Sequence, residues 1–432
     1  MNGRVARVGF LLLSIALLLL PCAAFAAGGG EAQKVTLRVW KAPYSDNDQG
    51  LLGAAFDEFK KAHPQVTIEF VVTPWETWVE KYTAAFAAGD PPEVFSAAQS
   101  FPYKFIQAGQ VVALDKKGWT KELKAIYPAN LLDAYFFEGH TYGVPYSFDG
   151  VTLVYNTELL KAAGIGAPPA TYDELVAQAK KLTHDKNGDG TPEVWGYGLM
   201  GNESGEAVNV YYAHLMAYGG VVAKPDGSRC LLDSAECVRG VQFMVDLLGK
   251  HKVSPPIGLF EGRALQSGFL RGEIAMMGTN PWFQMMSKQE NPNLQWEASL
   301  FPTAAPGAPR NATTGAGEGW LISEACKDKE LAWALIQALT KKDYVRKYLE
   351  AVSVLPARKD LLAEMYQDNK FMKTNLESTA NYLPWPKWPF IEWDLVIQEI
   401  QQAMLGKKTA EAAMKTAAFE LNNKLKEIGW YK

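Results

Sequence analysis

Two periods of hydrophobicity alternate along the first part of the chain. In some stretches every second residue is apolar, as in a strand, whereas the stretches between them place apolar residues three or four positions apart, as in a helix. The predicted order is strand, helix, strand, helix and strand, in residues 35–39, 52–63, 66–70, 78–88 and 93–97. Strands that alternate with helices pair in parallel, so the pattern predicts an α/β fold with helices on the faces of a sheet.

The same periods return further along the chain. Strands are expected in residues 151–155 and 273–277, and helices in residues 171–182, 237–250 and 329–339. An apolar stripe predicts a last helix and consists of Met414, Ala417, Leu421, Leu425 and Ile428. Residues 304–309 are rich in Ala and Pro without periodicity, which is typical of a linker. At 432 residues the chain is long enough for two or more domains.

Ligands bind beyond the carboxyl ends of the strands in open parallel sheets. Loops in such positions carry aromatic residues, polar residues or both, and they are residues 40–48, 73–78, 97–101 and 280–284. In the last of them Trp282 directly follows Asn280–Pro281, where a chain usually turns at the surface. This indole is either a core residue or a ligand platform, and its place after a predicted strand favours the platform. The glycine-rich segment 315–319 lacks the spacing of a dinucleotide fingerprint and predicts a close backbone approach or a hinge.

The first 26 residues have the pattern of a secretory signal peptide. Arginines precede the apolar run 8–20, and Ala24–Phe25–Ala26 matches a small-x-small cleavage site. The run is shorter than the roughly 18 residues that a membrane-spanning helix needs. We therefore expect cleavage after Ala26 and a periplasmic location. The alternative is acylation of Cys22 and a lipid-anchored protein at the cell surface, although Pro21 stands where lipoprotein signals have a small residue.

Cys230, Cys237 and Cys326 would remain in the mature chain, in a compartment that permits disulfides. A bridge between Cys230 and Cys237 would close a short loop and contribute about 2 to 3 kcal/mol on a chain-entropy estimate. Two buried thiols are the alternative, and Cys326 has no evident partner. We expect the disulfide.

Charge and composition narrow the class of partner. The net charge is −4 and the sequence has no basic block, which excludes a nucleic-acid role. The 13 Trp, 18 Tyr and 20 Phe residues serve either large cores or the flat apolar faces of ligands such as sugars.

The usual signatures of phosphate binding, nucleophilic hydrolysis and zinc catalysis are absent, and the five histidines have no ligand spacing. One segment resembles a calcium loop, with candidate ligands Asp185, Asn187, Asp189, Thr191 and Glu193. Its twelfth position is Gly196 instead of an acid, and a turn rich in Asn, Asp and Gly explains the same residues without metal. A structural calcium ion is thus one hypothesis, and no other cofactor is expected.

An ordered set of motifs resembles the extracellular solute-binding proteins of ABC sugar importers, the maltose-binding-like group. The motifs are FDEFKKAHPQV at 56–66, AAGDPPEV at 87–94, YGVP at 142–145, VYNTELL at 154–160 and NPW at 280–282. The resemblance covers essentially the whole mature chain. It implies two α/β lobes joined by hinge crossings, with the ligand in the cleft between them. Lobe one would comprise residues 34–148 and 311–352, and lobe two residues 152–308 and 356–432.

The resemblance also assigns site residues. Asp149 matches the acid that accepts hydrogen bonds from sugar hydroxyls, and Trp282 matches the aromatic residue on which a sugar ring stacks. Gln99 and Ser100 stand where the maltose-binding relative has a charged pair, and Ser96 where it has Trp, which argues against maltose itself. The remaining candidates lie in the strand-end loops or near binding segments of the family, and they are Trp40, Tyr44, Asp48, Trp75, Tyr146, Asn202, Glu203, Trp320, Trp385 and Trp388.

The expected function is high-affinity capture of a neutral mono- or oligosaccharide by a monomer that delivers it to the membrane permease of an ABC importer. Oriented Asp, Gln, Ser and Asn side chains suit hydroxyls, and aromatic planes suit the C–H face of a sugar. Few cations occupy the cleft loops apart from Lys41, so glycerol phosphate is a weaker alternative. A secreted glycoside hydrolase would need two carboxylates across the scissile bond, with Asp149 and either Glu203 or Glu318 as candidates. A surface adhesin would show repeats or an anchoring signal.

Overall fold

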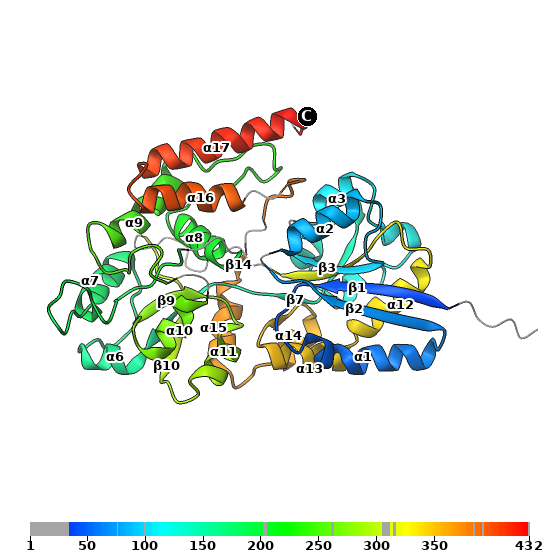
Figure 1. The fold of residues 1–432 in the computed structure, drawn as a ribbon, viewed down its shortest axis with the longest axis horizontal. Helices are drawn as coiled ribbons and strands as arrows, with labels where there is room; N and C mark the ends of the chain where they lie inside the picture. Colours follow the sequence, from blue (N-terminus) through cyan, green and yellow to red (C-terminus); the bar gives the residue numbers. More distant parts are fainter. Residues whose placement is uncertain are drawn as a thin grey trace, which may run out of the picture.

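The computed structural model describes residues 34–75, 77–98, 101–201, 205–260, 263–304, 312–313, 317–382, 385–390 and 393–430. Within these ranges the chain forms two lobes that lie side by side, each built on its own sheet (Figure 1). The predicted signal peptide and nearly all of the predicted linker at 304–309 lie outside the described residues. Every helix among the described residues is too short or too polar to span a bilayer.

The first lobe contains a five-stranded sheet whose strand order is β2-β1-β3-β12-β6. The strands are β1 (Val35–Lys41), β2 (Val66–Val72), β3 (Val94–Ala98), β6 (Gly143–Pro145) and β12 (Glu318–Ile322). β1 pairs in parallel with β2 and β3, which confirms the first three predicted strands and their direction. β12 runs antiparallel to both β3 and β6, so the sheet is mixed and not purely parallel as predicted.

Helices cover both faces of this sheet (Figure 1). One face carries α1 (Asp48–Ala62), α12 (Lys329–Leu339) and α13 (Lys342–Val352), and the other carries α2 (Trp78–Ala87) and α3 (Tyr103–Gln107). Between β3 and the second pair lies an aromatic cluster that consists of Trp78, Tyr82, Phe86, Phe95, Phe101 and Phe105. These six aromatic residues therefore serve a core, which is one of the two roles that the sequence proposed for its aromatic content.

The second lobe is built around the antiparallel sheet β10-β8-β9. Its strands are β8 (Thr152–Asn156), β9 (Met276–Thr279) and β10 (Trp296–Ser299). The surrounding helices are α6 (Thr157–Ala162), α7 (Tyr172–Leu182), α8 (Gly205–Ala217), α9 (Ala235–Leu248), α10 (Ala264–Arg271), α11 (Phe283–Glu290), α15 (Lys370–Ser378), α16 (Trp393–Met404) and α17 (Ala410–Glu427). Ile428 follows the last helix and is 42% exposed, so it does not continue the predicted apolar stripe.

Short elements join the lobes. β7 (Ser147–Phe148), which directly precedes the second lobe, pairs with β13 (Leu355–Pro356), where the chain passes from α13 to the last helices. Further short elements occur elsewhere along the chain, and they are η1 (Asp115–Lys117), α4 (Leu123–Ile126), α5 (Ala129–Asp133), β4 (Phe136–Phe137), β5 (His140–Thr141), β11 (Ala312–Thr313), α14 (Lys359–Glu364) and β14 (Asn381–Tyr382).

A histidine lies at the centre of the second lobe. His214 on α8 is fully buried, and the hydroxyls of Tyr172 and Tyr197 lie 2.8 and 3.0 Å from its two ring nitrogens. Burial lowers the pKa of His214 to about 3, because charging the ring would place a cation in an apolar core. The unfolded chain therefore binds a proton between about pH 6.5 and 3 that the folded chain does not.

This difference predicts acid sensitivity. Stability should fall as the pH drops below about 6.5, with a slope of up to about 1.4 kcal/mol per pH unit from this group. Chemical denaturation at stepped pH checks the slope, which His214→Gln should reduce. The exposed His184 provides the control, since His184→Gln should leave the slope unchanged. Equal slopes in all three proteins would contradict the assignment.

Candidate functional site

A buried ion cluster lies at the carboxyl end of β1. Lys41 is fully buried, and its ammonium lies 3.1 Å from Asp48 Oδ2 and 3.4 Å from Glu318 Oε2. It also donates a 2.6 Å hydrogen bond to the carbonyl of Ala42. Asp48, at the start of α1, accepts further hydrogen bonds from the Tyr348 hydroxyl and the backbone of Tyr44. The cluster therefore ties the end of β1 to the start of α1.

Glu318 extends this cluster along the edge of the sheet to β12, two strands away from β1. Its Oε2 accepts hydrogen bonds from the hydroxyls of Ser96, at 2.9 Å, and Tyr146. Burial raises the pKa of Glu318, and the Lys41 ammonium opposes that shift. The carboxylate is enclosed by these partners and is 2% exposed, so it faces the protein and not the solvent.

The glycines that flank Glu318 allow a close backbone approach. A Cβ atom on Gly317 would come within 2.5 Å of the carbonyl oxygen of Ser147, and one on Gly319 within 2.4 Å of the Tyr135 ring. Atoms cannot approach so closely without displacement, so these positions exclude a side chain. The prediction of a close backbone approach in this glycine-rich segment is confirmed for its described residues.

Tyr44, Tyr146 and Asp149 lie next to the ion cluster. Tyr146 is buried and stacks on the Trp320 ring, with 5.3 Å between the centroids. The Tyr44 hydroxyl lies 3.2 Å from Ser147 Oγ. Burial raises the pKa of Tyr44 well above its ordinary value, and the negative charges of Glu318 and Asp149 add to that shift. Asp149 itself is 7% exposed, at the point where the chain leaves the first lobe.

Trp75 is the exposed aromatic residue of this region. Its side chain is 37% exposed, and its indole N–H donates a 2.6 Å hydrogen bond to the carbonyl of Pro43. Its ring lies 6.4 Å from that of Tyr44 and packs edge-on against Trp78 at 5.7 Å. Trp40 is half-buried behind them, against Tyr82. Trp75 thus presents a fixed and partly open indole at the edge of the first lobe.

The second lobe contributes Trp282, which is also partly exposed. It lies in the turn between β9 and α11, and the Arg263 guanidinium lies 5.2 Å from the centre of its ring. The next residue, Phe283, is fully buried between Phe269 and Trp296. The chain therefore buries Phe283 and leaves part of the Trp282 indole open.

Three other predicted tryptophans are buried. Trp320, Trp385 and Trp388 are 2%, 5% and 0% exposed. Trp388 donates a 2.7 Å hydrogen bond to the carbonyl of Gly227, and Trp385 packs against Tyr212. Their rings are buried in this structure, and their predicted ligand role stays a prediction. Gln99, Ser100, Asn202 and Glu203 lie outside the described residues.

The structure corrects the predicted disulfide. Cys230 and Cys237 are both buried and are not joined to each other. Cys237 lies in the first turn of α9, and its thiol instead contacts the carbonyl of Val221 at 3.6 Å. Burial raises its pKa to about 11, which keeps it protonated. The alternative of buried thiols is therefore the one that the structure shows.

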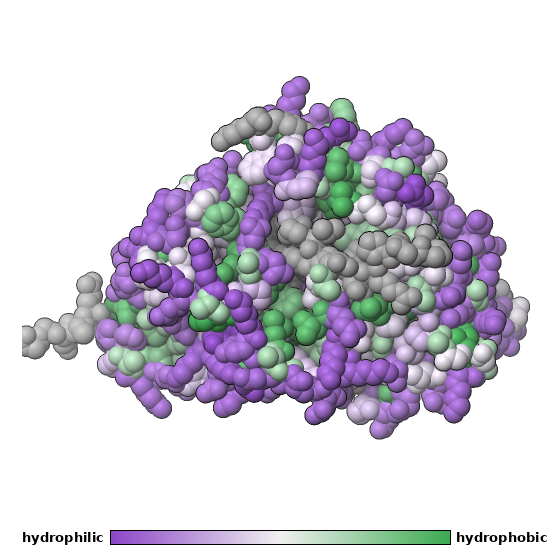
Figure 2. Space-filling model, turned by 180° about the vertical axis from the view of Figure 1, so that it is seen from behind, coloured by the Kyte–Doolittle hydropathy of each residue, from purple (hydrophilic) through white to green (hydrophobic). Residues whose placement is uncertain are grey.

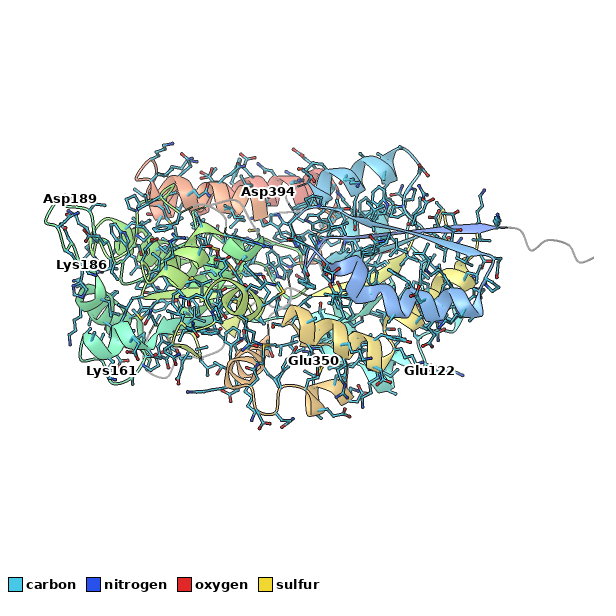
Figure 3. All side chains as sticks on the ribbon, turned by 60° about the horizontal axis from the view of Figure 1, so that its bottom comes forward. Glu122, Lys161, Lys186, Asp189, Glu350 and Asp394 are labelled. Carbon is cyan, nitrogen blue, oxygen red and sulfur yellow. The ribbon has the colours of Figure 1, made fainter. Side chains whose placement is uncertain are left out.

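The calcium-like loop lies at the outer end of the second lobe, where Figure 3 labels Lys186 and Asp189. Its side-chain oxygens accept backbone hydrogen bonds within the loop, including those from Gly188 and Gly190 to Asp185 at 2.7 and 2.8 Å. Among the described residues, no group of three or more His, Cys, Asp or Glu side chains is arranged to hold a metal ion. The calcium site stays a prediction.

Figure 2 shows one face of the molecule, whose rim is mostly hydrophilic. Apolar side chains are more frequent toward the middle of this face. A cavity of about 280 Å³ in the first lobe is lined by Leu123, Tyr127, Phe136 and Lys359 among others, and it contains none of the predicted site residues. The candidate site therefore rests on the strand-end residues.

Comparisons with known proteins agree with this architecture. Residues 42–346 match the family model described as bacterial extracellular solute-binding protein. The chain belongs to this family. A Brucella abortus relative named only as a binding protein is 29% identical over 384 residues, which cover 87% of this chain and 90% of the relative. The maltodextrin-binding protein MdxE of Bacillus subtilis is 22% identical, with 98% of each chain covered.

Solved structures of solute-binding proteins share the fold. The maltose-bound MalE3 of T. maritima has a TM-score of 0.78 at 25% identity, with 90% of this chain and 100% of that chain covered. The substrate-binding protein Lmo0181 of Listeria monocytogenes, in complex with cycloalternan, has a TM-score of 0.78 at 22% identity, with 91% and 99% covered. This extracellular solute-binding protein therefore has the two-lobed fold of periplasmic binding proteins.

Sequence reasoning named Lys41 and Glu318 but did not join them. The available signal was a lysine at the end of a buried strand, directly after Trp40, since a cation in such a place needs acidic partners. Glu206 on α8 and Arg263 beside α10 were missed in the second lobe, because neither belongs to a strand-end loop.

The ion cluster yields a prediction about stability. Lys41→Met would leave Asp48 and Glu318 as buried carboxylates without their cation, which should cost about 3 to 5 kcal/mol of unfolding free energy. Chemical denaturation of the ligand-free protein measures this loss. Lys60→Met on the exposed face of α1 should change stability by less than about 0.5 kcal/mol. Similar losses in both variants would contradict the role of the cluster.

Proposed function

We propose that this protein captures a neutral oligosaccharide in the cleft between its lobes and delivers it to the permease of an ABC importer. The observation that carries the proposal is the pair of partly exposed indoles, Trp75 on the first lobe and Trp282 on the second. Indole faces suit the C–H surfaces of sugar rings, and Asp149 and Tyr44 supply polar groups for hydroxyls. Two platforms on different lobes favour a ligand of more than one ring.

The state of Lys41 favours a neutral ligand. This is the cation that the sequence placed among the cleft loops, and its charge is taken up by Asp48 and Glu318 inside the first lobe. A phosphate ester such as glycerol phosphate would require several cations that face the ligand. Lys41 is not one of them, and Arg263 beside Trp282 is one cation whose guanidinium lies over that indole. The names of the relatives support the same class, since MdxE is a maltodextrin-binding protein and the two solved structures hold maltose and cycloalternan.

Binding by both lobes would also supply the energy for closure. A ligand shifts a mostly open population to a mostly closed one only if it binds the closed form more tightly by about 5.5 kcal/mol. Micromolar affinity corresponds to about −8 kcal/mol, which leaves room for such a difference. A sugar that contacts one lobe alone could not drive the change.

The family consists of binding proteins, and the structure supports binding over hydrolysis. Glu318, one candidate for a second catalytic carboxylate, is enclosed by Lys41, Ser96 and Tyr146. A glycosidase acid must reach the scissile bond. Incubation of the protein with a panel of oligosaccharides tests this point, since release of shorter sugars would contradict a pure binding role.

Trp282→Ala tests the binding site. A thermal-shift screen against mono- and oligosaccharides identifies the best ligand, and isothermal titration gives its Kd. The variant should abolish the thermal shift, because the sugar loses its stacking surface. The ligand-free variant should lose less unfolding free energy than a buried tryptophan contributes, which is about 3 to 5 kcal/mol. Trp119, half-buried against Trp333 outside the candidate site, is the matched control. Trp119→Ala should lower stability and keep the sugar affinity.

We further propose a monomer secreted across the inner membrane after cleavage at Ala26. Mass spectrometry of the mature protein distinguishes this product from one acylated at Cys22, which would place the protein on a lipid anchor. Size exclusion with light scattering tests the monomer.

The calcium hypothesis for the loop at 185–193 has a direct measurement. Bound calcium would raise the melting temperature, because a ligand that binds only the folded state stabilises it. The expected result is a melting temperature that falls on addition of EDTA and returns with excess calcium. Asp185→Asn should remove the response, and an unchanged melting temperature in the native protein would refute the hypothesis.

A further inference from the structure

A carboxylate beneath the Trp282 turn links three elements of the second lobe. Glu206, in the first turn of α8, accepts a 2.8 Å hydrogen bond from the hydroxyl of Thr279 at the end of β9. Its other oxygen accepts a 3.1 Å hydrogen bond from the side-chain amide of Gln266 on α10. The backbone N–H of Asn280 also donates to it. These partners lie directly before Trp282 in the chain or on the helix behind it.

The three residues that donate hydrogen bonds to Glu206 are shielded from water. Thr279, Gln266 and Asn280 are 0%, 1% and 2% exposed, so water cannot replace the carboxylate as an acceptor for them. A buried donor that loses its acceptor costs about 1 to 3 kcal/mol, and the backbone can avoid that cost only by moving. The residues just before Trp282 are thus tied to α8 and α10 through one carboxyl group.

Arg263 connects the same carboxylate to the indole. Its guanidinium lies 5.2 Å from the centre of the Trp282 ring, and its positive charge acts on Glu206. Cation and indole attract each other through the quadrupole of the ring, and cation and carboxylate through their charges. Glu206 therefore acts on Trp282 both through the backbone of the turn and through Arg263.

We infer that Glu206 is the positioning residue of the Trp282 platform, because it fixes the orientation in which the indole meets a sugar ring. The inference rests on the proposed function and extends it to a residue outside the ligand-binding set. Stacking on a sugar depends on the angle and height of the indole, so a platform of the right composition but loose orientation binds weakly.

The first test observes the indole itself and needs no sugar. Protein labelled with 5-fluorotryptophan gives a ¹⁹F resonance for Trp282, assigned by its absence in Trp282→Phe. Glu206→Ala should broaden or split this resonance, whereas that of the buried Trp388 should stay in place. Glu206→Gln, which keeps an acceptor oxygen, should restore a single line. An unchanged Trp282 resonance in Glu206→Ala would overturn the inference.

The second test measures affinity for the best sugar of the screen. Glu206→Ala should raise Kd about tenfold, and Glu206→Gln should raise it less. The measurement is made at pH 8.0, because burial raises the pKa of Glu206 to about 7. Glu236 also lies in the first turn of its helix, but 42% of its side chain is exposed, so Glu236→Ala is the matched control and should keep the Kd of the native protein.

The outcomes separate the two claims. A native protein that binds no saccharide in the screen overturns the proposed function, whatever the ¹⁹F spectra show. A native protein that binds sugar, loses it in Trp282→Ala and keeps its Kd in Glu206→Ala overturns the positioning role alone.

Discussion

Burial of the Lys41 ammonium is the constraint on which the ligand-facing side of the first lobe depends. A cation with no access to water is stable only with anions in close contact, and Asp48 and Glu318 meet that need. One anion begins α1 and the other begins β12, which is the strand that returns from the second lobe. The hydroxyls that surround these anions belong to Ser96, Tyr146 and Tyr348. One buried charge therefore holds segments from distant parts of the sequence in register at the end of the sheet.

Local pattern predicted the elements well where neighbouring residues decide the structure. The parallel strands β1, β2 and β3 and the helices between them follow from periods of two and of 3.6 residues, and α12 begins and ends as predicted. The antiparallel direction of β12 could not be predicted, because it depends on how the chain returns from the other lobe. Likewise, β9 begins at Met276 and not at Glu273, since Ile274 forms only an isolated bridge with Trp195.

The candidate site shows the same limit. Strand-end loops could be identified from sequence, and they contain Tyr44, Trp75 and Trp282. The exposure of a tryptophan could not, because Trp282 and Trp388 both follow or neighbour proline in similar segments, yet only the first keeps part of its ring open. The acids presented a related difficulty. Glu318 looks like an available carboxylate in the sequence, and only its contacts with Lys41, Ser96 and Tyr146 show that it is a structural anion.

The missing side chains at Gly317 and Gly319 determine which face of β12 carries the acid. Successive residues of a strand point to opposite faces, so a shift of one residue would turn Glu318 toward the Tyr135 ring, which now lies where a Cβ of Gly319 would be. The ring would reject the carboxylate, and Lys41 would lose an anion. The pairing of Glu318 with Ala98 and of Gly319 with Ala97 is thus enforced by packing as well as by charge. A segment that enters the sheet from another lobe can in this way reach only one alignment.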